Sequence, residues 1–171
     1  MKDEAIGAWE AAAIMGVHWS RPKKMADAGT IPSRVMCGQP GREFAVYSRE
    51  DCERDYRDYI AKRTVSRRPR AALADRPAAL RMLAAKGRPK IAFGDAIGAY
   101  EAAKMLGVFW TLVPRLAKEG KIVGRVLQSG RGQTSRLWIF SRQSCAAWEA
   151  EVSKLEQAGK KRGRPRSFVD R

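Results

Sequence analysis

The side chains that could do chemistry in this chain are mainly cationic, and they are unevenly placed. The net charge is +16 over 171 residues, but residues 62–90 alone carry +9 and residues 158–167 carry +5. These two segments therefore hold +14 of the +16. Such a field attracts a polyanion, either nucleic acid or an anionic membrane. A membrane would require a basic helix with a strong apolar face, which the tail lacks, so nucleic acid is the expected partner.

The residue types that carry catalysis are sparse. The chain has one histidine, His18, and three cysteines whose spacing fits neither a disulfide framework nor a zinc site. It has no phosphate-binding loop and no motif of paired carboxylates. We therefore expect no enzymatic activity, no metal and no cofactor. Cys52 and Cys145 fall at equivalent positions of an internal repeat, which predicts that both are small core residues.

The basic tail contains a short motif suited to the minor groove of DNA. A narrow A·T minor groove concentrates negative potential and attracts inserted arginine. Glycine between two arginines lets the backbone approach the groove floor, and proline keeps the strand extended. The motif resembles an AT-hook, expected to be disordered until bound; the alternative is a generic polycation. Its residues are Arg162, Gly163, Arg164 and Pro165, and a weaker copy in the linker consists of Lys86, Gly87, Arg88 and Pro89.

An internal repeat divides the chain into two modules. Residues 6–35 and 97–126 are identical at 14 of 30 aligned positions, and the match resumes at 44–49 and 137–142 after a two-residue insertion. Neither a transmembrane run nor a signal-peptide pattern is present, so we expect a cytoplasmic protein. The predicted organisation is repeat 1 over 1–61, a basic linker with a short helix over 62–90, repeat 2 over 91–157 and the tail over 158–171.

Each repeat is expected to form a helix, a tight turn, a second helix, a β-hairpin and a third helix. In repeat 1 the first helix should end at Gly16, and the second should run from about Ser20 to Ala28 with Gly29 after it. Ser20 and its counterpart Thr111 are the expected N-caps. The predicted strands cover 31–36, 44–47, 122–127 and 137–140, and the third helices are expected to open at Ser48 and Ser141. The fold class is therefore α+β, mainly α with small β-hairpins.

The motif at the start of each repeat resembles a known family. Glu10-Ala11-Ala12 followed by Met15-Gly16-Val17 returns as Glu101-Ala102-Ala103 followed by Leu106-Gly107-Val108, each before a helix that ends in glycine. This pattern resembles the MerR/excisionase type of winged helix-turn-helix DNA-binding domain over about 6–60 and 97–152. The resemblance implies two tandem winged helix-turn-helix domains joined by the basic linker.

The resemblance also implies which residues would contact DNA. The second helix of each module would read the major groove, and each hairpin would form a wing near the backbone. The helix residues implied by position are Trp19, Ser20, Lys23, Lys24, Trp110, Thr111 and Arg115. The wing residues implied by position are Arg34, Arg42, Arg125, Arg131 and Arg136. The alternatives are that the cations are merely solvated and that the two tryptophans pack in the core.

The third helix of repeat 1 is acidic, with interleaved arginines, and is expected to be a salt-bridged exposed face. It should stay away from phosphate, and it offers a surface for a protein partner. Its acidic residues are Glu50, Asp51, Glu53, Asp55 and Asp58.

The expected function is binding of double-stranded DNA, with preference for particular sequences or for A·T-rich tracts. The protein would be nucleoid-associated and act as a transcriptional regulator or an architectural factor. Three alternatives stay open: a phage or mobile-element accessory factor of the excisionase kind, an adaptor whose repeat 1 binds a protein, and an RNA-binding protein.

Overall fold

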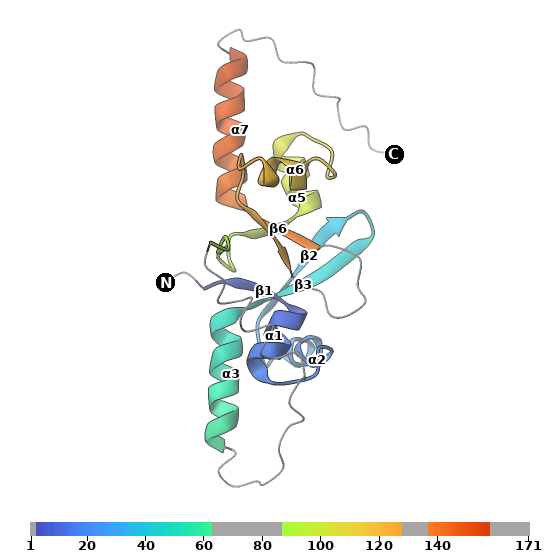
Figure 1. Cartoon of the computed structure of the whole chain (residues 1–171). Helices are drawn as coiled ribbons and strands as arrows, with labels where there is room; N and C mark the ends of the chain where they lie inside the picture. The colour runs from blue at the N-terminus through green and yellow to red at the C-terminus, as the bar shows by residue number, and fades with distance from the viewer. Residues whose placement is uncertain (1–2, 63–86, 128–136, 158–171) are drawn as a thin grey trace.

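The computed structural model describes residues 3–62, 87–127 and 137–157, and it is a mixed α+β structure (Figure 1). These residues form six helices and two three-stranded antiparallel sheets. Repeat 1 contains β1 (Ala5–Gly7), α1 (Ala8–Met15), α2 (Arg21–Asp27), β2 (Ser33–Gln39), β3 (Arg42–Ser48) and α3 (Arg49–Lys62). Repeat 2 contains β4 (Ala96–Gly98), α5 (Ala99–Leu106), α6 (Val113–Lys118), β5 (Gly124–Leu127), β6 (Leu137–Ser141) and α7 (Arg142–Gln157).

The helix boundaries follow local signals in the sequence. Gly16 ends α1 in the left-handed conformation with φ 63°, which a residue with a β-carbon rarely adopts. The Ser48 hydroxyl accepts the Asp51 N–H at 3.0 Å and caps α3, as predicted. The Ser141 hydroxyl accepts the Ser144 N–H at 3.1 Å and caps α7 in the same way. The order of helices and hairpins expected from the sequence is therefore present.

The starts of the second helices differ from the prediction. Ser20 does occupy the N-cap position of α2, but its hydroxyl bonds the His18 ring at 2.9 Å instead of a helix N–H. In repeat 2 the N-cap is Leu112, so Thr111 lies outside α6. The prediction of Thr111 as a cap was wrong because the turn after α5 runs one residue further than the pattern indicated.

Two short strands were not expected. β1 and β4 precede the first helix of each repeat and pair antiparallel with β3 and β6, so the strand orders are β1-β3-β2 and β4-β6-β5. Three residues each is too short for a periodic signal in the sequence. These strands convert each hairpin into a sheet with two large faces.

Each repeat has its own hydrophobic core between its helices and one face of its sheet. Cys52 and Cys145 are both 0% exposed in these cores, which confirms their prediction as core residues. Burial raises the pKa of the Cys52 thiol to about 12 and that of the Cys145 thiol to about 11. Both side chains therefore act as small apolar groups.

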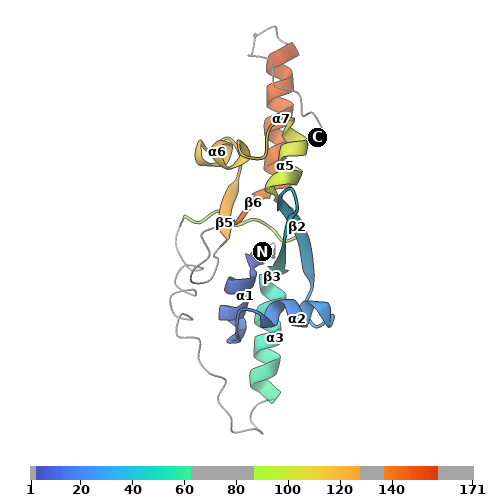
Figure 2. The same ribbon diagram turned by 90° about the vertical axis from the view of Figure 1, so that its right-hand side faces the viewer.

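A third core lies between the two sheets. Its residues are equivalent in the two repeats: Ala5 with Ala96, Met36 with Leu127, and Val46 with Ile139. Ile91, the first residue of repeat 2, completes it. The face of each sheet that its own helices leave uncovered thus packs against the same face of the other sheet. In the view of Figure 2, a half-turn about the viewing direction brings one repeat approximately onto the other.

The second and third helices lie on opposite sides of the molecule. In Figure 1, α3 and α7 run along the left side, whereas α2 and α6 lie toward the right. Within the described residues, no helix combines the length and apolar character needed to cross a membrane.

Candidate nucleic-acid interface

Helix α2 presents a cationic face to solvent. Arg21, Lys23 and Lys24 are exposed, while Pro22 and the half-buried Met25 face the protein. Pro22 fits here because the first turn of a helix has no intrahelical partner for its nitrogen. The Lys23 ammonium lies 2.9 Å from the exposed carboxylate of Asp27 one turn later. An exposed pair of this kind contributes about 0–1 kcal/mol, so phosphate can readily replace the carboxylate.

Helix α6 presents a smaller cationic face. Arg115 and Lys118 are exposed on it, and Val113 anchors it in the core of repeat 2. Arg115 pairs with Glu119 at 2.9 Å, and Lys121 pairs with the same carboxylate at 2.7 Å. Hydrogen bonds from Lys121 and then Arg115 lower the pKa of Glu119. The carboxylate therefore stays charged and holds both cations beside the end of α6.

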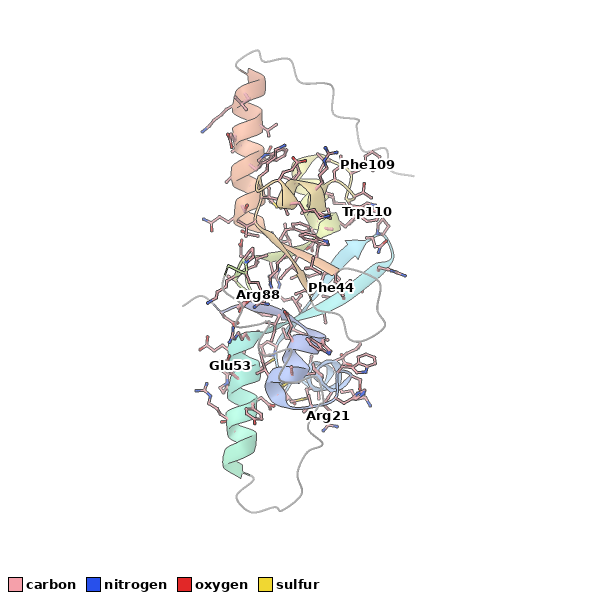
Figure 3. All side chains as sticks on the ribbon, viewed as in Figure 1. Arg21, Phe44, Glu53, Arg88, Phe109 and Trp110 are labelled. Atoms are coloured by element: carbon pink, nitrogen blue, oxygen red, sulfur yellow. The ribbon has the colours of Figure 1, made fainter. Side chains whose placement is uncertain are left out.

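The two equivalent tryptophans, Trp19 and Trp110, have different surroundings. Trp110 is half-buried and packs against the core of repeat 2. Trp19 is 55% exposed, and its ring lies 5.5 Å from the His18 ring. Phe109, the counterpart of His18, is 47% exposed and lies beside Trp110 on the same side of the molecule as Arg21 (Figure 3). The turns before α2 and α6 thus both expose an aromatic ring.

The two predicted wing residues of repeat 1 differ: Arg42 is exposed, and Arg34 is hydrogen-bonded to repeat 2. Arg42 is exposed at the turn between β2 and β3. Arg34 is half-buried, and its guanidinium donates to the carbonyl oxygens of Phe93 at 2.7 Å and Gly94 at 3.0 Å. Arg34 therefore joins the two repeats, and its prediction as a DNA-contacting wing residue is corrected.

Arg125 is also not a wing residue. It is only 4% exposed, and its guanidinium lies 3.0 Å from the Glu10 carboxylate of repeat 1. It donates as well to the Ala5 carbonyl oxygen, and it lies 3.6 Å from Glu4. An arginine is rarely buried unless its charge is paired, and here the carboxylates come from the other repeat. The predicted DNA contact of Arg125 is therefore corrected to a structural ion pair.

The linker copy of the AT-hook-like motif ends in the same ion cluster. The Arg88 guanidinium lies 2.8 Å from Glu10 and also pairs with Glu4. Burial and the nearby charge of Arg125 lower the pKa of Arg88, while the two carboxylates act in the opposite direction. The predicted insertion of Arg88 into a minor groove is therefore corrected, because its guanidinium is paired with Glu4 and Glu10 inside the protein. Gly87 and Pro89 are exposed beside it.

Several predicted features lie outside the described residues. They are the linker helix expected near residues 75–85, the wing residues Arg131 and Arg136, and the hook residues Lys86, Arg162, Gly163, Arg164 and Pro165. They remain predictions from the sequence.

Two exposed cations of this surface were missed by the sequence reasoning. Arg21 is the first residue of α2, and Lys118 is the last residue of α6. Arg21 directly precedes the first-turn proline, and Lys118 stands three residues after Arg115, one turn along the same helix. Both signals were present in the sequence.

No protein-family model matches the chain, and no curated protein matches its sequence. The functional argument therefore rests on the repeat, the charges and the geometry.

Proposed function

We propose that this protein binds double-stranded DNA through α2 and α6, in a pair of winged helix-turn-helix modules. The observation that carries the proposal is that both second helices, each of which has exposed cations, lie on one side of the molecule, opposite α3 and α7 (Figure 1). Arginine and lysine on such a face can bond guanine N7 and O6 or the phosphates. The acidic helix α3 lies on the opposite side, where its carboxylates would stay away from the DNA phosphates (Figure 1).

The arrangement within each repeat supports the winged helix-turn-helix interpretation. α1 and α2 are joined by a short turn that begins at the left-handed Gly16, and an antiparallel hairpin follows them. Arg42, which is exposed at the hairpin turn, would contact the sugar-phosphate backbone. Backbone contacts of this kind fix the register of a reading helix without carrying sequence information.

The basic tail adds a second mode of contact to the proposal. Arg162 and Arg164 would enter an adjacent A·T-rich minor groove, because its narrow width concentrates negative potential. The protein would act as a transcriptional regulator or a nucleoid-type architectural factor, or as an excisionase-like accessory factor of a mobile element. It would not act as an enzyme.

A charge-matched pair of variants tests the proposal. Lys23→Gln/Lys24→Gln removes two positive charges from the proposed DNA face, and Arg54→Gln/Arg57→Gln removes two from α3 on the opposite side. Binding to a 30-base-pair duplex is measured by fluorescence anisotropy from 50 to 200 mM salt. If the full chain contacts 6–10 phosphates, its affinity should fall by about 10³–10⁵ over this range.

The α2 variant should reduce the slope of log K against log salt by about 2, and the α3 variant should leave it nearly unchanged. Equal effects of the two variants would show that binding follows net charge alone. Stronger binding to double-stranded or single-stranded RNA than to the duplex would favour an RNA-binding protein instead.

A further inference from the structure

We infer that the single chain is an internal pseudo-dimer that reads two unequal half-sites in inverted orientation. This inference rests on the proposed function and adds the form of the DNA target. It starts from the packing between the repeats, because that packing decides how α2 and α6 are oriented relative to each other.

The interface between the repeats is isologous. The same three sheet positions of each repeat meet in the shared core, as in the pairs Ala5 with Ala96 and Val46 with Ile139. A patch that packs against its own equivalent is the signature of two-fold symmetry in a homodimer. In this chain, the same approximate two-fold symmetry relates the two repeats of a single molecule.

Reciprocal polar contacts reinforce this symmetry. Arg34 of β2 reaches the chain just before β4, and Arg125 of β5 reaches the chain at the start of β1. Backbone bonds also join the segments, with the Ala5 N–H donating to the Ile91 carbonyl at 2.8 Å and the Phe93 N–H donating to the Asp3 carbonyl at 2.7 Å. The relative orientation of the two repeats is therefore set by packing and hydrogen bonds.

Close approach at one glycine also fixes the packing. β2 lies against β4 and the start of α5, and a β-carbon at Gly98 would collide with the carbonyl group of Cys37. Gly98 thus lets the hairpin of repeat 1 cross repeat 2. In Figure 1 this hairpin runs from its own repeat toward α5 and α6.

The symmetry has a consequence for DNA. Viewed along the pseudo-two-fold axis in Figure 2, α2 and α6 lie on opposite sides of the axis, and Figure 1 shows them on the same side of the molecule. Helices related in this way fit two half-sites in inverted orientation, separated by one helical turn of roughly 10 base pairs or a multiple of it. A tandem of independently tethered modules would impose no such separation.

The two half-sites should differ in sequence because the exposed residues of the helices differ. Positions equivalent in the repeats pair Arg21 with Leu112, Lys23 with Pro114, Lys24 with Arg115 and Asp27 with Lys118. α2 therefore offers a cation where α6 offers a 44% exposed leucine. The symmetry of the scaffold is conserved in the structure while the reading surfaces are not equivalent.

A surface graft tests the inference with the full chain. The substitutions Thr111→Ser, Leu112→Arg, Pro114→Lys, Arg115→Lys and Lys118→Asp give α6 the exposed residues of α2 and leave the net charge unchanged. The wild type and the graft are each used to select duplexes from a pool with a random 40-base-pair core. Circular dichroism and thermal unfolding check that the graft is folded.

The wild type should select two different sequence elements at one fixed separation, and the graft should select the same element twice in inverted orientation. A direct repeat, a single element, or two elements at variable separation would overturn the inference while leaving DNA binding intact. Failure of the wild type to retain any duplex would overturn the proposed function as well.

A second measurement holds even if the graft does not fold. Insertion of 5 base pairs between the selected elements turns one half-site to the opposite face of the duplex, whereas insertion of 10 restores the face. The 5-base-pair insertion should weaken wild-type binding by about 100-fold, because simultaneous engagement is lost. Equal affinity for the parent and the 5-base-pair insertion would overturn the inference.

Discussion

Arg34 and Arg125 occupy the same position in the two repeats, but their surroundings differ. Arg125 is buried among two carboxylates and a carbonyl group of repeat 1, while Arg34 is half-buried and donates to two backbone carbonyls of repeat 2. The cause lies at the start of each repeat. Glu10 and its counterpart Glu101 each accept the N–H of the glycine before their helix, but the buried Glu10 also pairs with Arg88 and Arg125, and Glu4 is buried in the same cluster.

This comparison shows how a duplicated sequence can acquire unequal halves. The described end of the linker enters this side of the interface, where Arg88 joins Arg125 on the same two carboxylates and Arg49 also pairs with Glu4. An ion cluster that is buried needs every charge to be paired, because an unpaired buried charge is strongly destabilising. Buried ion pairs therefore join repeat 1 both to the linker, through Arg88, and to repeat 2, through Arg125.

The largest expected effect is a difference in the stability lost when Arg125 and Arg34 are each replaced by methionine. Arg125→Met leaves the buried Glu10 carboxylate paired with Arg88 alone, while Glu4 keeps Arg49 and Arg88, and it should lower the free energy of unfolding by about 3 kcal/mol. Arg34→Met removes hydrogen bonds to carbonyl groups at a partly exposed site and should cost about 1 kcal/mol. Urea denaturation of both variants measures the difference. Equal costs would show that the ion cluster does not distinguish the repeats.

Alkaline pH should destabilise repeat 1 more than repeat 2. Burial raises the pKa of both Tyr47 and Cys52 to about 12, while the counterpart of Tyr47 is Phe140, which does not titrate. A raised folded pKa for a group that is neutral when protonated gives stability that is present below the unfolded pKa and lost as the pH rises toward the folded value. Stability should therefore fall between about pH 8.5, the ordinary thiol pKa, and pH 12.

Tyr47→Phe gives repeat 1 the residue of repeat 2 and sharpens this test. The variant should lose less stability than the wild type between pH 10 and 12 in urea titrations. Cys145→Ala, which removes a thiol of repeat 2 with a pKa raised to about 11, should change the alkaline loss less than Cys52→Ala does. An identical pH profile for all these proteins would contradict the assignment of the loss to buried core groups.

The two glycine-arginine-proline motifs should respond differently to the same change. Gly87 has φ 84°, so Gly87→Ala should cost about 1 kcal/mol of stability through backbone strain and leave A·T preference unchanged. Gly163→Ala should leave stability unchanged and weaken binding to A·T-rich duplex more than to G·C-rich duplex, with an unaltered salt slope. If Gly163→Ala binds both duplexes like the wild type, the tail is an ordinary polycation.

The smallest expected effect concerns the core cysteines. Cys52→Ala and Cys145→Ala should each cost about 1 kcal/mol, as expected for removal of one buried heavy atom, and leave DNA affinity unchanged once folded. Anisotropy titrations and denaturation curves check both quantities. Loss of DNA binding by one folded variant would reveal a role for that thiol beyond packing.

Much of the fold was predictable because its signals are local. Glycines that end helices, serines that cap them and the glycine-containing turns of the hairpins depend on residues a few positions apart. The core positions of Cys52 and Cys145 followed from their equivalence in the repeat. The short strands β1 and β4 were missed because the strands they pair with, β3 and β6, lie about 40 residues further along the chain.

The sequence by itself determined that there are two copies of one folding unit, that both are α+β, and where the excess positive charge is concentrated. Only the tertiary structure decided which cations face solvent. Arg21, Lys24 and Arg115 are exposed, while Arg34 and Arg125 join the two repeats and Arg88 joins the linker to repeat 1. The physical reason is that burial of a guanidinium depends on carboxylates and carbonyl groups brought to it by packing, and Arg125 finds Glu10 from 115 residues away.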